Sequence, residues 1–310
     1  MRKIGVLYGM ERTFPPALVD RINAMQVDGV VAEHLKTGGV KMAAPSGYKV
    51  IVDRISQDVP FYRAYLKNAT LNGTVVLNNP FWWTADDKFF NFAIMSQLGV
   101  AIPPTVLLPH REHPPNTKSE SMSNLIYPLN WQEIFDYVGF PAFLKPFDGG
   151  GWRAVTKVSN VEEFFAAYNA SGTDCMTLQR GVKFDNYFRC YVIGQEKVHV
   201  MRYDPGAPHH ERYVKNGAPI APALYDRVVR DCLTICRTLG YDINTVEFAC
   251  EGGVPYAIDF LNPAPDADIN SVGQDNFDWI VNAVAELAVK KAVSNDNPAR
   301  EMRWSAFLNG

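Results

Sequence analysis

Residues 143–152 read FLKPFDGGGW, and this stretch decides how the chain is interpreted. An apolar run ends in Lys145 and a proline, and three consecutive glycines follow one acidic residue. Glycines let backbone N–H groups approach a ligand closely and bend into an anion-binding concavity. Because a second strand is predicted at residues 154–158, the glycines form the turn between two antiparallel strands. The stretch therefore predicts a cradle for a chain of phosphates, to which Lys145 adds a positive charge.

A flexible hairpin tip with a solvated lysine is the simpler interpretation of the same residues. The chain contains no GxxxxGK[ST] pattern, which excludes a Walker P-loop, and no GxGxxG follows the first predicted strand, which excludes a Rossmann fingerprint. The phosphate interpretation therefore depends on finding matching parts elsewhere in the chain.

Length and composition narrow the class of protein. A chain of 310 residues is long enough for two or three packed subdomains, and a net charge of −3 argues against a general nucleic-acid binder. The N-terminus does not resemble a secretory signal, and no apolar run is long enough to span a membrane. The scattered cysteines form no CxxC pair, so we expect reduced thiols in a cytoplasmic protein. They are Cys175, Cys190, Cys232, Cys236 and Cys250.

Strands alternate with helices over residues 1–83, which predicts a small parallel sheet covered by helices. The expected strands are residues 3–8, 29–35, 48–56 and 74–79, and the expected helices are residues 15–25 and 61–73. This range forms the first predicted subdomain, an α/β unit.

The second predicted subdomain, residues 84–180, mixes helices with antiparallel strands. Thr84 and Asp87 form a predicted capping box for a helix that Gly99 ends, and Ser159 and Glu162 form another. Further elements are expected at residues 100–109, 131–139, 141–146, 154–158, 161–170 and 175–180. The proline-rich residues between 109 and 130 are a predicted loop.

The third predicted subdomain, residues 181–310, is also α+β. Strands are expected at residues 187–194, 197–203, 244–250 and 254–261, and helices at residues 221–240 and 276–293. The last two strands form a predicted hairpin around Gly252 and Gly253. Glu247 and Asp259 can then face each other across it.

These two acidic residues lie among apolar neighbours, where an unpaired carboxylate is energetically expensive. A magnesium ion would remove that cost, and Asn262 could supply a third oxygen ligand. Pairing of the two carboxylates with arginines is the alternative interpretation.

The assembled motifs resemble the ATP-grasp superfamily, in particular its ribosomal-protein glutamate ligase and glutathione synthetase branch. The resemblance covers about residues 45–290. In chain order, the motifs are DK at residues 87–88, LGVAIPPT, FLKPFDGGGW, LQRGV, FRCYVIG, VMRY, VEF and AIDFLNP. The resemblance implies an ATP-grasp fold, in which ATP lies between two antiparallel sheets.

The resemblance also implies roles for residues near the nucleotide. Lys88 and Lys145 would contact phosphates, and a flexible lid would close over them. That lid would be formed by Gly149, Gly150 and Gly151. The hinge strand beside adenine would comprise Gln179, Arg180, Gly181 and Val182, and Asp185 would hydrogen-bond the ribose.

By the same resemblance, Arg189 and Arg202 would steady the transferred phosphoryl group or an acyl phosphate. Glu247, Asp259 and Asn262 would hold one or two Mg²⁺ ions, with Mn²⁺ as an alternative.

Two positions depart from the pattern of this family. The last metal strand usually reads acid-x-Asn, whereas here two residues, Phe260 and Leu261, separate Asp259 from Asn262. Asn262 can therefore be a ligand only if the chain bulges or shifts. The hinge usually carries an acidic partner for adenine, and Arg180 stands in its place.

The resemblance implies a Mg-ATP-dependent ligase that joins a small-molecule or peptide carboxylate to an amine, or less often a thiol, through an acyl phosphate. A small-molecule kinase and a non-enzymatic ATP-binding module are the alternatives, and a homodimer is left open. Substrate contacts are expected from Arg12 and Arg54 at strand ends, although Arg54 could instead pair with Asp53 or Asp58. His209 and His210 are interpreted as part of a solvated loop.

Overall fold

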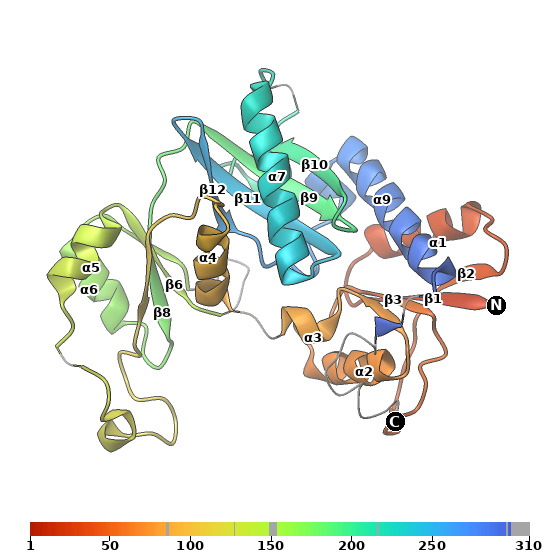
Figure 1. Ribbon diagram of the computed structural model, residues 1–310, viewed down its shortest axis with the longest axis horizontal. Helices are drawn as coiled ribbons and strands as arrows, with labels where there is room; N and C mark the ends of the chain where they lie inside the picture. The colour runs from red at the N-terminus through yellow and green to blue at the C-terminus, as the bar shows by residue number, and fades with distance from the viewer. Residues whose placement is uncertain (85–86, 127, 149–153, 216, 296, 299–310) are drawn as a thin grey trace. The chain divides into compact units, whose positions relative to one another are not determined.

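The structure is a computed structural model (Figure 1), and it describes residues 1–84, 87–126, 128–148, 154–215, 217–295 and 297–298. Within these residues there are three four-stranded sheets, one in each predicted subdomain range. The chain forms two compact units. The first comprises residues 1–85, 187–248 and 259–310, and the second comprises residues 86–186 and 249–258. The N-terminal range and most of the C-terminal range therefore share a unit.

The first sheet is parallel, as predicted, with the strand order β2-β1-β3-β4. Its strands are β1 (Arg2–Leu7), β2 (Val30–His34), β3 (Val50–Asp53) and β4 (Val75–Leu77). Its helices are α1 (Phe14–Ala24) and α2 (Pro60–Leu71). The helix α9 (Gln274–Val293), from the far end of the chain, packs beside α1 and against β1. Helices cover both faces, which explains why β3 is buried along its whole length.

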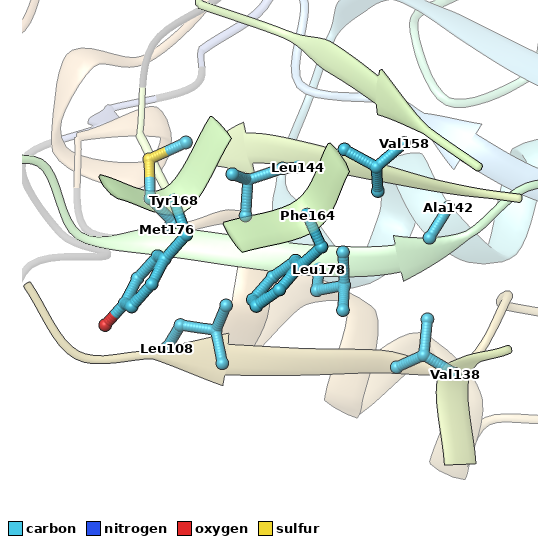
Figure 2. Close-up of a cluster of buried hydrophobic side chains, with 9 residues drawn as sticks. All are labelled: Leu108, Val138, Ala142, Leu144, Val158, Phe164, Tyr168, Met176 and Leu178. Carbon is cyan, nitrogen blue, oxygen red and sulfur yellow. The ribbon is translucent and has the colours of Figure 1, made fainter. Parts of the chain in front are cut away.

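The second sheet is antiparallel, with the order β5-β8-β6-β7. Its strands are β5 (Thr105–Leu108), β6 (Ala142–Pro146), β7 (Thr156–Val158) and β8 (Met176–Arg180). Its helices are α5 (Trp131–Val138) and α6 (Val161–Asn169). Figure 2 shows their shared core, in which Phe164 and Tyr168 lie near Leu144 and Leu178. The two aromatic residues are four apart, so they occupy one face of α6.

The third sheet has the order β10-β9-β11-β12. Its strands are β9 (Asn186–Ile193), β10 (Lys197–Arg202), β11 (Ile243–Glu251) and β12 (Val254–Asp259). The long helix α7 (Pro222–Leu239) lies across this sheet in Figure 1. Its buried Cys232 lies next to the buried Cys190 of β9. Because side chains alternate along a strand, the neighbouring positions of β9 point to the opposite face.

The remaining helices are short. They are α3 (Pro80–Trp83), α4 (Lys88–Gln97), α8 (Ile269–Val272) and 3₁₀ turns at Ser119–Met122 and His209–Glu211. None of the helices in the described part of the chain combines the length and the apolar composition needed to cross a membrane.

The two predicted capping boxes are placed differently by the structure. Asp87, not Thr84, is the N-cap of α4, and its carboxylate accepts from the backbone N–H of Phe90 at 2.7 Å. Asn160, not Ser159, is the N-cap of α6, and Glu163 is its reciprocal partner. Both predictions were wrong because several neighbouring residues were able to cap, and the backbone conformation selects among them.

Candidate functional site

The second unit carries a group that we call the lysine cluster, formed by Lys145, Gln179 and Thr105. Lys145 lies on β6 and is buried, and its Nζ donates to Oε1 of Gln179 on the neighbouring strand β8 at 2.8 Å. Nε2 of the same glutamine donates to the Thr105 hydroxyl of β5, also at 2.8 Å. The ammonium lies 5.0 Å from the ring centroid of Phe92. Three strands thus hold one cation in a largely apolar setting, where its attraction for an anion is weakly screened.

The predicted hinge, Gln179 to Val182, comprises the last two residues of β8 and the two residues that follow it. The backbone N–H of Arg180 donates to Pro104 at 2.9 Å, and that of Gly181 donates to Pro141 at 2.7 Å. Proline has no N–H to return these hydrogen bonds. The carbonyl groups of Arg180 and Gly181 therefore receive no ladder hydrogen bond from the residues opposite, and they can accept from a ligand instead.

The Arg180 side chain occupies the position where an acid is expected. Its Nη1 lies 3.3 Å from Oε2 of Glu251, and its guanidinium lies 5.0 Å from the ring centroid of Tyr256. Glu251 also accepts from the backbone N–H of Lys183 at 3.2 Å. An acidic side chain is therefore present beside the hinge after all, supplied by the end of β11 and neutralised by Arg180.

The first unit carries a second group, the carboxylate cluster, formed by Glu247, Asp259, Tyr187 and Arg189. Glu247 lies on β11 and is only 9% exposed. The Tyr187 hydroxyl donates to its Oε2, and the Arg189 Nε lies 3.7 Å from its Oε1. Tyr187 and Arg189 are two apart on β9, so they share the face of the sheet opposite to the face that Cys190 presents.

Electrostatics in this cluster favour a cation. Burial raises the pKa of Glu247, Arg189 opposes the shift, and the neighbouring charge of Asp259 raises the pKa further. A buried carboxylate whose pKa is raised by a neighbouring carboxylate is relieved when a divalent ion binds beside both groups.

Despite the extra residue in the sequence, Asn262 contacts β11 two positions before Glu247. Its Nδ2 donates to the Thr245 carbonyl at 3.0 Å, and its backbone N–H donates to Oδ1 of Asn244 at 3.1 Å. Asn244 also donates to the Phe260 carbonyl at 2.9 Å. The buried Asn244 amide thus satisfies the backbone where the chain leaves β12. The Oδ1 of Asn262 is the atom that this side chain would offer to a cation.

The donor set fits magnesium, which takes carboxylate and amide oxygens and keeps places for phosphate and water. It does not suit a metal held by protein side chains alone. In the described ranges no group of three or more His, Cys, Asp or Glu residues could hold such an ion.

Scans against protein-family models and against curated proteins gave no match. Solved structures are similar over nearly the whole chain. The ATP-grasp ligase PsnB, complexed with its minimal precursor, Mg and ADP, has a TM-score of 0.63 and 14% identity, covering 94% of this chain and 98% of that one. The D-alanine–D-alanine ligase of Bacillus anthracis, complexed with ATP, has a TM-score of 0.62 and 15% identity, with the same coverage. An ATP-grasp RimK domain protein of Sphaerobacter thermophilus has a TM-score of 0.63 and 16% identity, covering 93% and 99%.

The chain has the ATP-grasp fold. Identities of 14–16% establish the fold alone, so the roles of individual residues depend on their own geometry.

The other residues predicted to bind the nucleotide differ in their surroundings. Lys88 is the first residue of α4, and its backbone N–H donates to the Phe147 carbonyl at 3.4 Å. Asp185 is exposed and accepts from the Asn186 amide at 3.1 Å. Gly149, Gly150 and Gly151 lie outside the described residues.

The structure does not bring the two predicted phosphoryl-binding arginines together. In the register of β9 with β10, Arg189 lies opposite Met201, and Arg202 lies opposite Phe188. The Arg202 guanidinium is 5.6 Å from the Phe188 ring centroid and donates to the Ala218 carbonyl. The two arginines therefore extend from opposite faces of the sheet.

Arg54 is buried and already paired, although not with its sequence neighbours. It forms a bidentate ion pair with Glu11, in which Nε donates at 3.0 Å and Nη2 at 2.5 Å, and it donates to the Pro265 carbonyl at 2.7 Å. Arg12 is exposed, with its Nη1 near the backbone carbonyls of Gly9 and Glu11. Of the two, only Arg12 has an exposed side chain.

Sequence reasoning missed the tyrosines of this site. Tyr187 contacts Glu247, and Tyr203 lies below the Arg189 guanidinium with its ring centroid 5.5 Å away. Strand alternation was the available signal, because Tyr187 is two residues from the predicted Arg189. Nothing in the sequence marked Tyr213, which reaches the cluster from the loop after β10.

Proposed function

We propose that the protein is a Mg-ATP-dependent carboxylate–amine ligase that forms an acyl phosphate and releases ADP and phosphate. The observation that carries this proposal is the carboxylate cluster, in which the charge of Asp259 raises the pKa of the buried Glu247 and Asn262 contacts the strand that carries Glu247. A pair arranged in this way suits Mg²⁺ better than it suits a ligand-free state.

In this proposal the chain positions and neutralises rather than forming covalent bonds of its own. Lys145 would attract a phosphate oxygen, and the carbonyl groups of Arg180 and Gly181, which lie opposite prolines, would accept from the amino group of adenine. Glu247, Asp259 and Asn262 would hold magnesium, which supplies Lewis-acid polarisation of phosphate oxygens when bound. Lys88, Val182 and Asp185 would also contact the nucleotide, as the resemblance implies.

The chemistry has two steps. A carboxylate oxygen of the substrate attacks the terminal phosphorus of ATP, the bond to ADP breaks, and an acyl phosphate forms. The amine then attacks the acyl carbon and loses a proton, and phosphate leaves. Arg189 neutralises charge on the transferred group, and exclusion of water protects the acyl phosphate from hydrolysis.

The substrates are a carboxylate and an amine, either small molecules or a peptide. Both kinds of ligase occur among the similar structures, since PsnB is complexed with a precursor peptide and another is a D-alanine–D-alanine ligase. We place the protein in the cytoplasm, in keeping with its five free cysteines.

Phosphorus NMR of the purified protein with Mg-ATP and a deproteinised cell extract tests the proposal, with a control that lacks extract. Extract-dependent ADP and free phosphate support the ligase and allow the substrates to be fractionated. ADP with a new phosphoester signal would instead indicate a kinase. AMP with pyrophosphate would contradict the acyl-phosphate route. ATP binding without turnover would indicate a binding module.

A further inference from the structure

A second group joins Arg189 at the carboxylate cluster. Tyr213 lies in the loop between β10 and α7, and a β-bridge to Tyr203 anchors it. Its ring meets the Tyr203 ring edge to face, with the centroids 5.1 Å apart. Arg189 approaches the same Tyr203, with Nη1 3.5 Å from its hydroxyl. Tyr203 is thus flanked by the guanidinium of Arg189 and the phenol of Tyr213.

Each flanking group has a buried polar atom that makes no hydrogen bond, although the Arg189 Nε lies 3.7 Å from Oε1 of Glu247. Among the described residues, no hydrogen-bond partner is found for the Tyr213 hydroxyl or for the Arg189 Nε, and both atoms are shielded from solvent. Tyr213 is only 8% exposed as a whole residue. Leaving such a group unsatisfied in a buried position is unfavourable, so it points to a missing partner.

The missing partner is an anionic oxygen. The guanidinium N–H can only donate and is permanently cationic, and the phenol hydroxyl is able to donate, so an anionic oxygen satisfies both. The neighbouring carboxylates repel anions unless a metal is bound. Tyr213 and Arg189 lie near enough to interact electrostatically with each other and with Glu247. The same enclosure that shields them from solvent suits an acyl phosphate, which water would hydrolyse.

We propose that Tyr213 and Arg189 together form an oxyanion subsite that binds the transferred phosphoryl group. This inference rests on the proposed ligase function and adds a residue to it. Tyr213 takes the place beside Arg189 that the sequence analysis gave to Arg202. Arg202 extends from the opposite face of the sheet and does not reach this subsite.

The test is Tyr213→Phe, with Tyr225→Phe as the matched control. Tyr225 lies on α7, is 41% exposed and belongs to neither cluster. Binding of Mg-ADP is measured first, and inorganic phosphate is then titrated onto the protein saturated with Mg-ADP. Because a hydrogen bond to a charged group is lost, Tyr213→Phe should weaken phosphate binding about tenfold or more, and Mg-ADP affinity should be unchanged.

Thermal unfolding without ligands gives a second readout. An orphan hydroxyl contributes nothing to the free protein, so Tyr213→Phe should unfold at the same temperature as the wild type or higher. A clear loss of stability would show that the hydroxyl has a structural partner, and the inference would fail.

The remaining outcomes separate the two proposals. Equal phosphate affinity in wild type and Tyr213→Phe overturns the subsite alone, and so does a wild type that binds Mg-ADP but no phosphate. A wild type that does not bind Mg-ADP overturns the ligase proposal and the subsite with it.

Discussion

The proposed metal site requires Glu247 to be ionised, in a place where burial makes ionisation unfavourable. Tyr187 donates to one carboxylate oxygen, and Arg189 lies near the other, yet the net effect of the surroundings still raises the pKa of this group. The two partners therefore offset only part of the cost of burying this charge. Such partial pairing is expected where a ligand completes the site, because a fully paired carboxylate would gain nothing from a bound cation.

Asp259 offers the sharpest test of the metal assignment. Asp259→Asn removes a charge and almost no volume, so we expect turnover to be abolished while the fold is kept. Mg²⁺-dependent ADP binding should fall in parallel, which calorimetry with and without Mg²⁺ measures. Asp226→Asn, at an exposed position on α7, is the matched control. Normal turnover in Asp259→Asn would end the metal assignment.

Residue chemistry was partly visible in the sequence. An acid or lysine inside an apolar strand stands out, which is why Lys145, Glu247 and Asp259 were predicted as functional. Tyrosines do not stand out, because they are ordinary core residues until their partner is known. Arg54 pairs with an acid 43 positions away rather than with Asp53 or Asp58, and only tertiary structure decides such a choice.

At the scale of elements, strand and helix positions followed from hydrophobic patterning, but their ends and registers did not. The sequence predicts β9 and β10 correctly as successive strands. Their pairing register, set at the turn between them, places Arg189 and Arg202 on opposite faces. A shift by one residue would have placed them together, and periodicity alone does not decide between the two registers.

Substitutions at the N-terminus of α6 show which residue caps this helix. Asn160 accepts from the N–H of Glu163 at 2.8 Å, whereas no contact of the Ser159 side chain is found in the described structure. Asn160→Ala should lower the free energy of unfolding by about 1 kcal/mol, and Ser159→Ala should leave it nearly unchanged. Urea unfolding of both variants measures the difference. An equal loss in both would restore the prediction made from sequence.

On α7, Asp231 should make stability depend on pH. Burial raises its pKa, and this effect outweighs the attraction of Arg230 and Arg227. The folded state then binds more protons than the unfolded state just above the ordinary carboxyl pKa, so stability falls as pH rises through that window. Asp231→Asn should therefore be more stable than the wild type at pH 7, and the gain should shrink as pH falls below about 4.

Thermal unfolding of the wild type and Asp231→Asn, measured from pH 7 to pH 3, tests this prediction. A gain for Asp231→Asn that stays constant from pH 7 down to pH 3 would mean that the carboxyl is not the cause. A loss at pH 7 would mean that the ion pairs with Arg227 and Arg230 outweigh the cost of burial.

At the scale of the whole molecule, the first unit is assembled from three separate segments of the chain. The sequence predicted the sheets but not this grouping, because contiguous ranges are the natural assumption when only the sequence is read. The long helix α9 explains the result. It is encoded last, but it packs on the first sheet beside α1, so the N-terminal strands depend on residues more than 200 positions away.

Asn78 joins these segments at a single point. Its Nδ2 donates to the carbonyls of Ile243 at 2.7 Å and Pro263 at 2.9 Å. Its Oδ1 accepts from the N–H groups of Asp242 and Ile243 at 2.7 and 2.8 Å. These four bonds use the full capacity of one amide at a position only 2% exposed.

Asn78→Ala should therefore cost far more than an ordinary amide substitution. It leaves backbone groups of the third sheet and of the loop after β12 without partners, so we expect the free energy of unfolding to fall by about 3 kcal/mol or more. The exposed Asn72→Ala is the control, with an expected change within about 0.5 kcal/mol. Denaturant unfolding followed by intrinsic fluorescence measures both. A loss below 1 kcal/mol for Asn78→Ala would mean that water replaces the amide, and that the first and third sheets are held together by apolar packing alone.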